Sequence, residues 1–164
     1  MKKILTLQAL LFAAALFAAP LNYIDDHGAI SGTATSDGSI TTYRDASGRV
    51  IGSSSPSGNQ ILYRSAHGQL VATAEQSGNR TTYRDARGQI FGSATTDGNQ
   101  ITYRDHKSRI VGTATFSENL TTYRNVSGKF LGTVSSGENN AFTRDAFFHV
   151  LISAKGDFGI RFGN

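Results

Sequence analysis

A repeat of twenty residues runs through most of this 164-residue chain and limits what the chain can fold into. Tyrosine recurs at intervals of twenty residues, arginine follows it directly in five of the six cases, and glycine recurs at three further positions of the same period. The tyrosines are Tyr23, Tyr43, Tyr63, Tyr83, Tyr103 and Tyr123. Seven units fit, beginning near residues 21, 41, 61, 81, 101, 121 and 141. In such an array each unit is one supersecondary element that hides its apolar face against its neighbours.

Each unit has the pattern of two short strands and two turns. Residues 81–85 and 89–95, for example, are rich in β-branched and aromatic residues and are bounded by Gly, Asn, Asp or Ser. Ser47-Gly48 is typical of one turn and Gly58-Asn59 of the other, and such tight turns make consecutive strands antiparallel neighbours. The sequence therefore predicts an all-β fold, with seven tandem hairpin repeats in an antiparallel meander of about 14 strands.

The turn type decides which side chains share a face of the sheet. A two-residue turn at Ser47-Gly48 would place Tyr43 opposite Gly52, and an aromatic ring over a strand glycine is a stabilising pair. Alternation then predicts one apolar face, which includes Ile101, Tyr103, Ile110, Gly112 and Ala114. The opposite face would carry Thr102, Arg104, Val111, Thr113 and Thr115. A three-residue turn ending in the bulge glycine would shift this register by one and move Arg onto the apolar face, which is disfavoured because buried guanidinium groups need partners.

Side-chain size falls along the second strand of every unit. Three successive positions on the predicted apolar face differ in side-chain size. The first position has a large apolar residue in every unit, the second is mostly Gly, and the third has a small residue. The residues at the large position are Ile30, Val50, Leu70, Ile90, Ile110, Phe130 and Val150, and those at the small position are Ala34, Ser54, Ala74, Ala94, Ala114, Val134 and Ala154. This taper predicts converging backbones, as in a shallow closed barrel or ring, with an open array as the alternative.

The last unit departs from the repeat. Thr143 replaces Tyr, and residues 146–149 replace the glycine turn. An atypical terminal unit is expected where an array is capped or closed. We predict that a final strand at residues 158–162 pairs with the first strand near Leu21–Asp25, which would remove both sheet edges.

Two known families share parts of this pattern. The run of residues 45–50, with Tyr43 just ahead, resembles YD repeats of the Rhs type, which form large β shells around toxins, although here Arg44 separates Tyr from Asp. The whole repeat region is more similar to the β-flower proteins, in which short tandem hairpins with a Tyr-then-Gly pattern close into a shallow, roughly symmetric barrel. That resemblance implies a closed barrel and an association with a membrane or a ligand.

The N-terminal residues have the layout of a secretory signal peptide. Lys2 and Lys3 precede a mainly apolar run over residues 4–17, and small residues follow. The run is shorter than the roughly 20 residues needed to span a bilayer. We expect residues 1–18 to be removed, by cleavage after Ala18 or alternatively Ala15. Residues 19–164 would then be the β-hairpin repeat domain of an exported protein that is periplasmic, secreted or on the cell surface.

Composition argues against several function classes. The formal charge of +4 includes Lys2 and Lys3, and the other basic residues are spread over the repeats, so we expect no nucleic-acid binding. The chain has no cysteine, and its histidines lack ligand spacing; they are His27, His67, His106 and His149. No phosphate loop or nucleophile elbow occurs. We therefore expect no enzyme, no metal site and no cofactor. Strands of about six residues are also too short to span a membrane, which takes about 9–11.

The most regular polar feature is the arginine set, which is Arg44, Arg64, Arg84, Arg104, Arg124 and Arg144. In a closed ring these guanidinium groups would form a belt able to hold anionic glycans, lipopolysaccharide phosphates or lipid head groups. The plainer interpretation is a solvated face on which each Arg lies beside a nearby Asp.

A second regular array consists of Thr and Ser. It places Thr42, Thr82, Thr102 and Thr122 beside Ser53, Ser93, Thr113 and Thr133. A flat, ordered Thr face can bind ice or sugars, although Thr is also a good strand residue in its own right. The sequence thus predicts a non-catalytic protein that binds an envelope or surface component, a glycan or an anionic lipid, through a repeated Arg/Thr face. The alternative is a structural or self-assembling surface protein without a small ligand.

Overall fold

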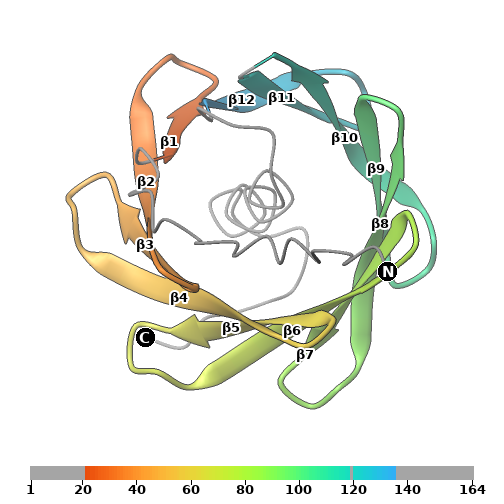
Figure 1. The fold of residues 1–164 in the computed structure, drawn as a ribbon. Helices are drawn as coiled ribbons and strands as arrows, with labels where there is room; N and C mark the ends of the chain where they lie inside the picture. The colour runs from red at the N-terminus through yellow and green to blue at the C-terminus, as the bar shows by residue number, and fades with distance from the viewer. Residues whose placement is uncertain (1–20, 119, 136–164) are drawn as a thin grey trace, which may run out of the picture.

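The computed structural model describes residues 21–118 and 120–135, which form a closed antiparallel β barrel (Figure 1). The strands are β1 (Leu21–Asp25), β2 (Ile30–Asp37), β3 (Ile40–Asp45), β4 (Val50–Ser57), β5 (Gln60–Ser65), β6 (Leu70–Ser77), β7 (Arg80–Asp85), β8 (Ile90–Asp97), β9 (Gln100–Asp105), β10 (Ile110–Ser117), β11 (Leu120–Asn125) and β12 (Phe130–Ser135). Each strand pairs with the next along the chain, and β12 returns to β1. The predicted all-β fold of hairpin repeats closed into a ring is confirmed.

The barrel closes with the sixth repeat. β1 pairs with β2 along one edge and with β12 along the other, so both of its edges are occupied. The prediction that residues 158–162 pair with β1 is therefore wrong, because twelve strands already complete the circle. The rest of the predicted seventh unit and the predicted signal peptide, residues 1–18, lie outside the described residues.

The turn after each odd-numbered strand has three residues, not the two predicted. Between β3 and β4, the Asp45 N–H donates to the Arg49 carbonyl at 3.0 Å, and the Gly48 N–H donates to the Asp45 carbonyl at 2.9 Å. Gly48 has a φ of +83°. This is a type I turn followed by a left-handed glycine, and it pairs Arg44 with Val50.

A second irregularity follows at once and restores the predicted pairing of Tyr with Gly. The register shifts between Tyr43 and Arg44, so that Tyr43 lies opposite Gly52 and Ile51 becomes the extra residue of a β-bulge. Because each pair shares a face, Val50 lies on the outer face with Arg44, while Ile51 packs against the core. The predicted Tyr–Gly pair is thus confirmed.

The prediction that the large apolar residues after the turn face the core is, in contrast, wrong. Ile30, Leu70, Ile90 and Ile110 are exposed, whereas Val111, which was assigned to the polar face, packs against the core. The reason is that one additional residue in a strand reverses the facing of every side chain between the turn and the bulge. Val50 and Phe130 share this outward position but are half-buried, and Val150 lies outside the described residues.

The inner face of the barrel carries the six tyrosines, none of them more than 5% exposed. Small residues pack between the rings. The residues at the predicted small position are buried in all six described units, from Ala34 to Val134. The strands approach closely here: a Cβ on Gly52 would lie 2.5 Å from the carbonyl oxygen of Arg64 on β5. Tyr rings therefore line the inner face, and at the glycine opposite a ring the backbone of the next strand leaves no room for a larger side chain.

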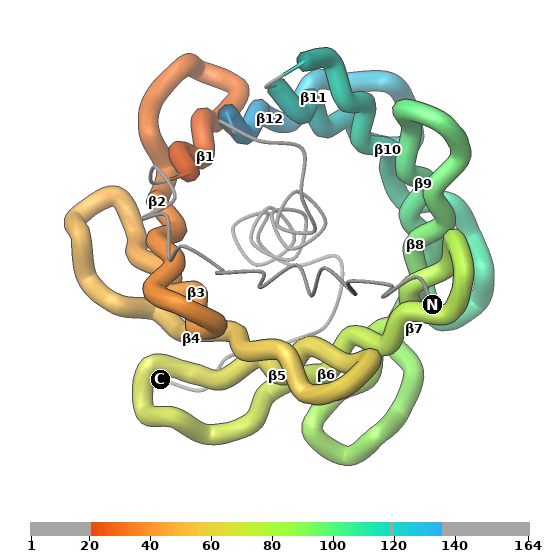
Figure 2. Tube along the Cα trace, in the orientation of Figure 1, coloured from red at the N-terminus to blue at the C-terminus, as the bar shows by residue number. Residues whose placement is uncertain are grey.

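The two kinds of turn gather at opposite ends of the barrel. The turn after each even-numbered strand has two residues, as at Gly58-Asn59, and Gly58 has the positive φ, +62°, that a type II′ turn requires at this position. We call the end with the three-residue turns the Asp rim (residues 24–30, 44–50, 64–70, 84–90, 104–110 and 124–130). The other end is the Gly-Asn rim (residues 35–40, 55–60, 75–80, 95–100 and 115–120, without 119). Figure 2, viewed along the barrel, shows the Asp-rim turns projecting outward from the ring.

Candidate functional site

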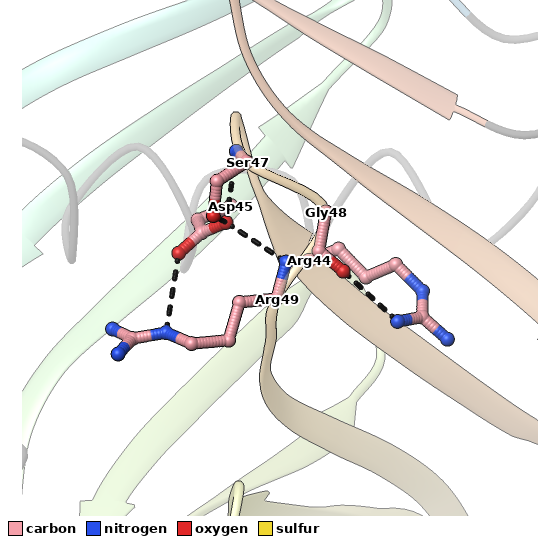
Figure 3. A network of polar contacts seen from close by, with 5 residues as sticks. All are labelled: Arg44, Asp45, Ser47, Gly48 and Arg49. Atoms are coloured by element: carbon pink, nitrogen blue, oxygen red, sulfur yellow. Dashed lines mark hydrogen bonds and ion pairs between the residues drawn. The ribbon is translucent and has the colours of Figure 1, made fainter.

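The Asp rim is built from a repeated network of side chain to backbone hydrogen bonds (Figure 3). Asp45 Oδ1 accepts from the N–H groups of Ser47 at 2.9 Å and Arg49 at 3.0 Å, and from the Ser47 hydroxyl at 2.6 Å. Equivalent pairs of N–H bonds reach Asp25, Asp85, Asp105 and Asn125 in the other repeats. The carboxylate of each Asp thus closes its own turn, as Asp and Asn commonly do.

The repeated arginines hold the other side of the same turns. Arg44 Nη1 donates to the Gly48 carbonyl at 3.0 Å, and the guanidinium lies folded along the turn in Figure 3. Arg64, Arg84, Arg104 and Arg124 make the same bond to the residue four positions later, at 3.0–3.2 Å. These five predicted site residues therefore have a structural role in the turns. Arg144 lies outside the described residues.

The same arginines alternate with apolar residues around the outside of the barrel. Each lies directly opposite the residue just after the turn, giving the pairs Arg44–Val50, Arg64–Leu70, Arg84–Ile90, Arg104–Ile110 and Arg124–Phe130. We call these ten residues the Arg–aliphatic belt, although its last apolar member is aromatic. Arg64 and Arg124 are exposed, and the other three arginines are half-buried. The structure thus brings the five described arginines into one ring, as predicted, but mixes them with apolar side chains.

Charge is divided between the two rims. In the described part of the chain, the Asp rim carries ten Lys or Arg residues against five Asp, and the Gly-Asn rim carries one Arg against four Asp or Glu. The cations of the Asp rim are Arg44, Arg49, Arg64, Arg84, Arg87, Arg104, Lys107, Arg109, Arg124 and Lys129. The acidic residues of the Gly-Asn rim are Asp37, Glu75, Asp97 and Glu118. One end of the barrel is therefore basic and the other acidic.

Several of the basic residues at the Asp rim were missed by sequence reasoning. Arg87 and Lys107 are exposed in the adjacent turns after β7 and β9, and no ion pair joins either of them to a carboxylate among the described residues. Arg49 and Arg109 are also exposed, but they pair with Asp45 at 3.4 Å and Asp105 at 2.6 Å. The residue at these positions varies between repeats, so strict periodicity does not reveal them. The sequence nevertheless indicates them, because Arg or Lys recurs at two variable turn positions: Arg87 and Lys107 share one, and Arg49, Arg109 and Lys129 share the other.

Three carboxylates of the Asp rim, those of Asp25, Asp45 and Asp105, have a lowered pKa, which favours their charged form. The Ser47 hydroxyl, together with the N–H groups of Arg49 and Ser47, lowers the pKa of Asp45, and partial desolvation only weakens that effect. The Ala29 N–H is the main cause that lowers the pKa of Asp25. Desolvation acts to raise the pKa of Asp105, but hydrogen bonds from Arg109 and Lys107 outweigh it, so that the pKa is lowered.

The Thr and Ser array forms a band on the outer face, next to the belt; its members are half-buried except Ser93, which is buried. The predicted neighbours are direct cross-strand partners: Thr42 with Ser53, Thr82 with Ser93, Thr102 with Thr113, and Thr122 with Thr133. The band is interrupted in places, since Glu75 lies opposite Thr82 on the other side and the Arg80 guanidinium reaches Ser93 Oγ at 3.4 Å. The array is therefore real, but it is not a flat, uniform Thr surface.

A cavity and a cluster of titratable side chains lie outside the belt. The cavity, of about 430 Å³, opens beside the Gly-Asn rim; the described residues of its wall include Ile61, Tyr63, Tyr83, Gln60 and Gln76, and none of them is charged. Asp25, Asp26 and His27 place three potential metal ligands within 4.8 Å of one another. Asp25 already accepts two backbone N–H groups, and Asp26 contacts both His27 and Lys129, so turn contacts account for this cluster.

The fold and the rim together define a class of protein: a closed barrel of twelve antiparallel strands, made of repeated hairpins, with charge of opposite sign at its two ends. Among solved structures, the chain is similar to the X-ray structure of a protein from Arabidopsis thaliana, with a TM-score of 0.51 and 11% sequence identity. The similarity covers 84% of this chain and 93% of the other, and it concerns the fold. No protein-family model matches the sequence, and no curated protein matches it. In residues 21–118 and 120–135 no helix is long and apolar enough to cross a bilayer.

Proposed function

We propose that this protein is an exported, non-catalytic β-repeat protein that binds an anionic envelope or surface component at its Asp rim. The observation that carries the proposal is the division of charge, with ten cations against five carboxylates at one end and one against four at the other, among the described residues. A surface on which cations outnumber carboxylates attracts polyanions, and several contacts can form at once because the turns stand side by side.

The turn network is compatible with this role. A guanidinium has five N–H donors, and the bond from Nη1 to the turn carbonyl uses one of them in Arg64 and Arg124. A guanidinium held in this way loses less side-chain freedom on binding, which favours recognition of phosphate, sulfate or carboxylate groups. Four of the five Asp carboxylates already accept N–H groups of their own turns, which lessens their opposition to this attraction; they are Asp25, Asp45, Asp85 and Asp105.

Binding of the purified protein to dextran sulfate, a soluble polyanion, tests the proposal directly. We expect binding that weakens as salt is raised, because exposed charges are screened. Changing Arg87→Gln together with Lys107→Gln should weaken it several-fold. The control Ser39→Glu with Gln100→Glu makes the same change in net charge at the Gly-Asn rim and should have much less effect. Absence of binding, or equal loss in both double variants, would show that the Asp rim is not the site.

The alternative is a structural or self-assembling protein without a small ligand. Assembly through free strand edges has little support, because every strand of the described barrel is paired on both sides. Light scattering over a range of concentrations separates the two proposals. A monomer at all concentrations contradicts self-assembly, whereas growth of assemblies that is independent of Arg87 and Lys107 would favour it.

A further inference from the structure

We infer that the Asp rim docks on a lipid surface that carries anionic head groups, with the turns entering the head-group layer. This inference rests on the proposed function and names the partner that the rim fits. Charge alone would suit any polyanion. The additional observation is that exposed apolar side chains gather at the same end of the barrel as the excess of cations.

The apolar residues of the Asp rim are large and exposed. Of the seven large apolar side chains exposed in the described part of the chain, five belong to the Asp rim: Ile30, Leu70, Ile90, Ile110 and Val126. Val126 stands in the turn between β11 and β12 and is 70% exposed. The other two, Ile40 and Leu120, belong to the Gly-Asn rim, where the described acidic residues outnumber the single Arg. Among the residues that the structure describes, the Asp rim alone therefore combines exposed apolar surface with excess positive charge.

The Arg–aliphatic belt has the pattern expected at the boundary between head groups and acyl chains. Arg84 lies opposite Ile90 and Arg104 opposite Ile110, so each apolar side chain has a guanidinium beside it at the same height. Long basic side chains can lie along apolar surface while their charged ends stay at the polar layer. At about 3.3 Å per residue, the belt lies within roughly 10 Å of the turn tips. Amphipathic surfaces bury about 5–10 Å deep at this boundary.

A soluble polyanion would not account for the exposed isoleucines. A phosphate or sulfate chain in water interacts with Arg87 and Lys107 and gains nothing from Ile90 or Ile110. A lipid surface interacts with both sets, because basic residues approach its head groups and apolar residues leave water. The two kinds of partner therefore predict different effects of the same substitutions.

Sedimentation with vesicles of phosphatidylcholine alone, and of phosphatidylcholine with phosphatidylglycerol, tests the inference. We expect the purified protein to bind only the anionic vesicles. Arg87→Gln with Lys107→Gln should weaken vesicle binding about tenfold, since each basic residue near such a surface contributes several-fold. Ile90→Thr with Ile110→Thr keeps β-branched residues in the strands and should weaken vesicle binding several-fold, while binding of dextran sulfate stays unchanged. Circular dichroism verifies that each variant is folded.

A second measurement does not depend on affinity. The chain has no cysteine, so Val126→Cys and Ser39→Cys allow an environment-sensitive dye to be placed at either rim. The dye at position 126 should shift to the blue on anionic vesicles, and the dye at position 39 should not. Unchanged vesicle binding in the isoleucine double variant, or equal dye responses at both rims, would overturn the inference. If dextran sulfate still binds at the Asp rim in that case, the proposed function stands; if neither partner binds, both proposals fail.

Discussion

Arg84 Nη1 lies 3.1 Å from the carbonyl oxygen of Gly88, across the turn between β7 and β8. On the same turn, Asp85 Oδ1 accepts from the N–H groups of Arg87 and Gln89. Adjacent residues of the repeat thus hold the turn from two sides, one through a carbonyl and one through N–H groups. The regular spacing of Arg in this sequence is explained first by folding, and binding at the rim depends on additional cations.

Replacing Arg84 by Met should destabilise the barrel by about 0.5–1.5 kcal/mol, because the side chain keeps its apolar stem but no longer donates to the Gly88 carbonyl. The midpoint of urea unfolding measures the change. Arg87→Met in the same turn is the control, since the Arg87 side chain makes no hydrogen bond to the turn in the described structure, and it should stay within about 0.5 kcal/mol. Equal losses would contradict the role assigned to Arg84.

Asp85→Asn should be nearly neutral, whereas Asp85→Ala should cost about 1 kcal/mol of stability. The sixth repeat already carries Asn125 at this position, and its Oδ1 accepts from the Ser127 and Lys129 N–H groups at 3.0 and 2.9 Å. An amide oxygen can thus replace the carboxylate, and a methyl group cannot. Thermal unfolding of both variants distinguishes hydrogen bonding from charge: a large loss in the Asn variant would show that charge matters more.

Ser108→Gly should stabilise the protein by roughly 0.5–1 kcal/mol, because Ser108 has a φ of +62° where all five other described repeats have Gly. The left-handed conformation costs an L residue about 1–2 kcal/mol, and the greater freedom of Gly in the unfolded chain offsets part of this gain. The reverse change, Gly88→Ser, should destabilise by a similar amount. A decrease in the unfolding midpoint of Ser108→Gly would contradict the strain assigned to this turn.

Stability should fall as the pH is lowered from about 5 through the native pKa values of Asp25, Asp45 and Asp105. Their pKa values are lowered in the folded barrel, so the folded state binds fewer protons than the unfolded chain over this window. Their contribution is present above the unfolded value near 3.8 and is lost as the folded groups protonate. Urea midpoints measured from pH 7 to pH 3 test this. Asp45→Asn should reduce the dependence on pH, and an unchanged profile would count against it.

Gly52→Ala should destabilise the barrel by about 1–3 kcal/mol, because the new Cβ would lie 2.5 Å from the Arg64 carbonyl and the strands would have to separate. The third repeat carries Ala72 at this position and buries it fully, so the strands there accommodate a methyl group. Ala72→Gly should therefore also destabilise, through lost packing and added chain entropy. A stabilising effect of either change would show that the strand spacing is less specific than proposed.

Local pattern was enough to predict the hairpins and most of the buried face. Tyr103, Gly112 and Ala114 were assigned correctly, because alternation along a strand is a local property and the Tyr–Gly pair recurs in five of the six described units. The arginines were also predicted to lie together. What their guanidinium groups contact was not predictable, because the carbonyl partner becomes available only when the three-residue turn forms.

The sequence by itself determined an array of β-hairpins with the tyrosines on the buried face, because the period, the turn glycines and the alternation of side chains are local properties of the chain. Tertiary structure alone decided three things. A bulge beside the Tyr–Gly pair put Ile110 on the outer face and Val111 against the core, and one residue more or less in a strand cannot be read from alternation. Closure after twelve strands depends on the tilt and stagger of the whole sheet. The division of charge arises only when the closed meander brings alternate turns to opposite ends.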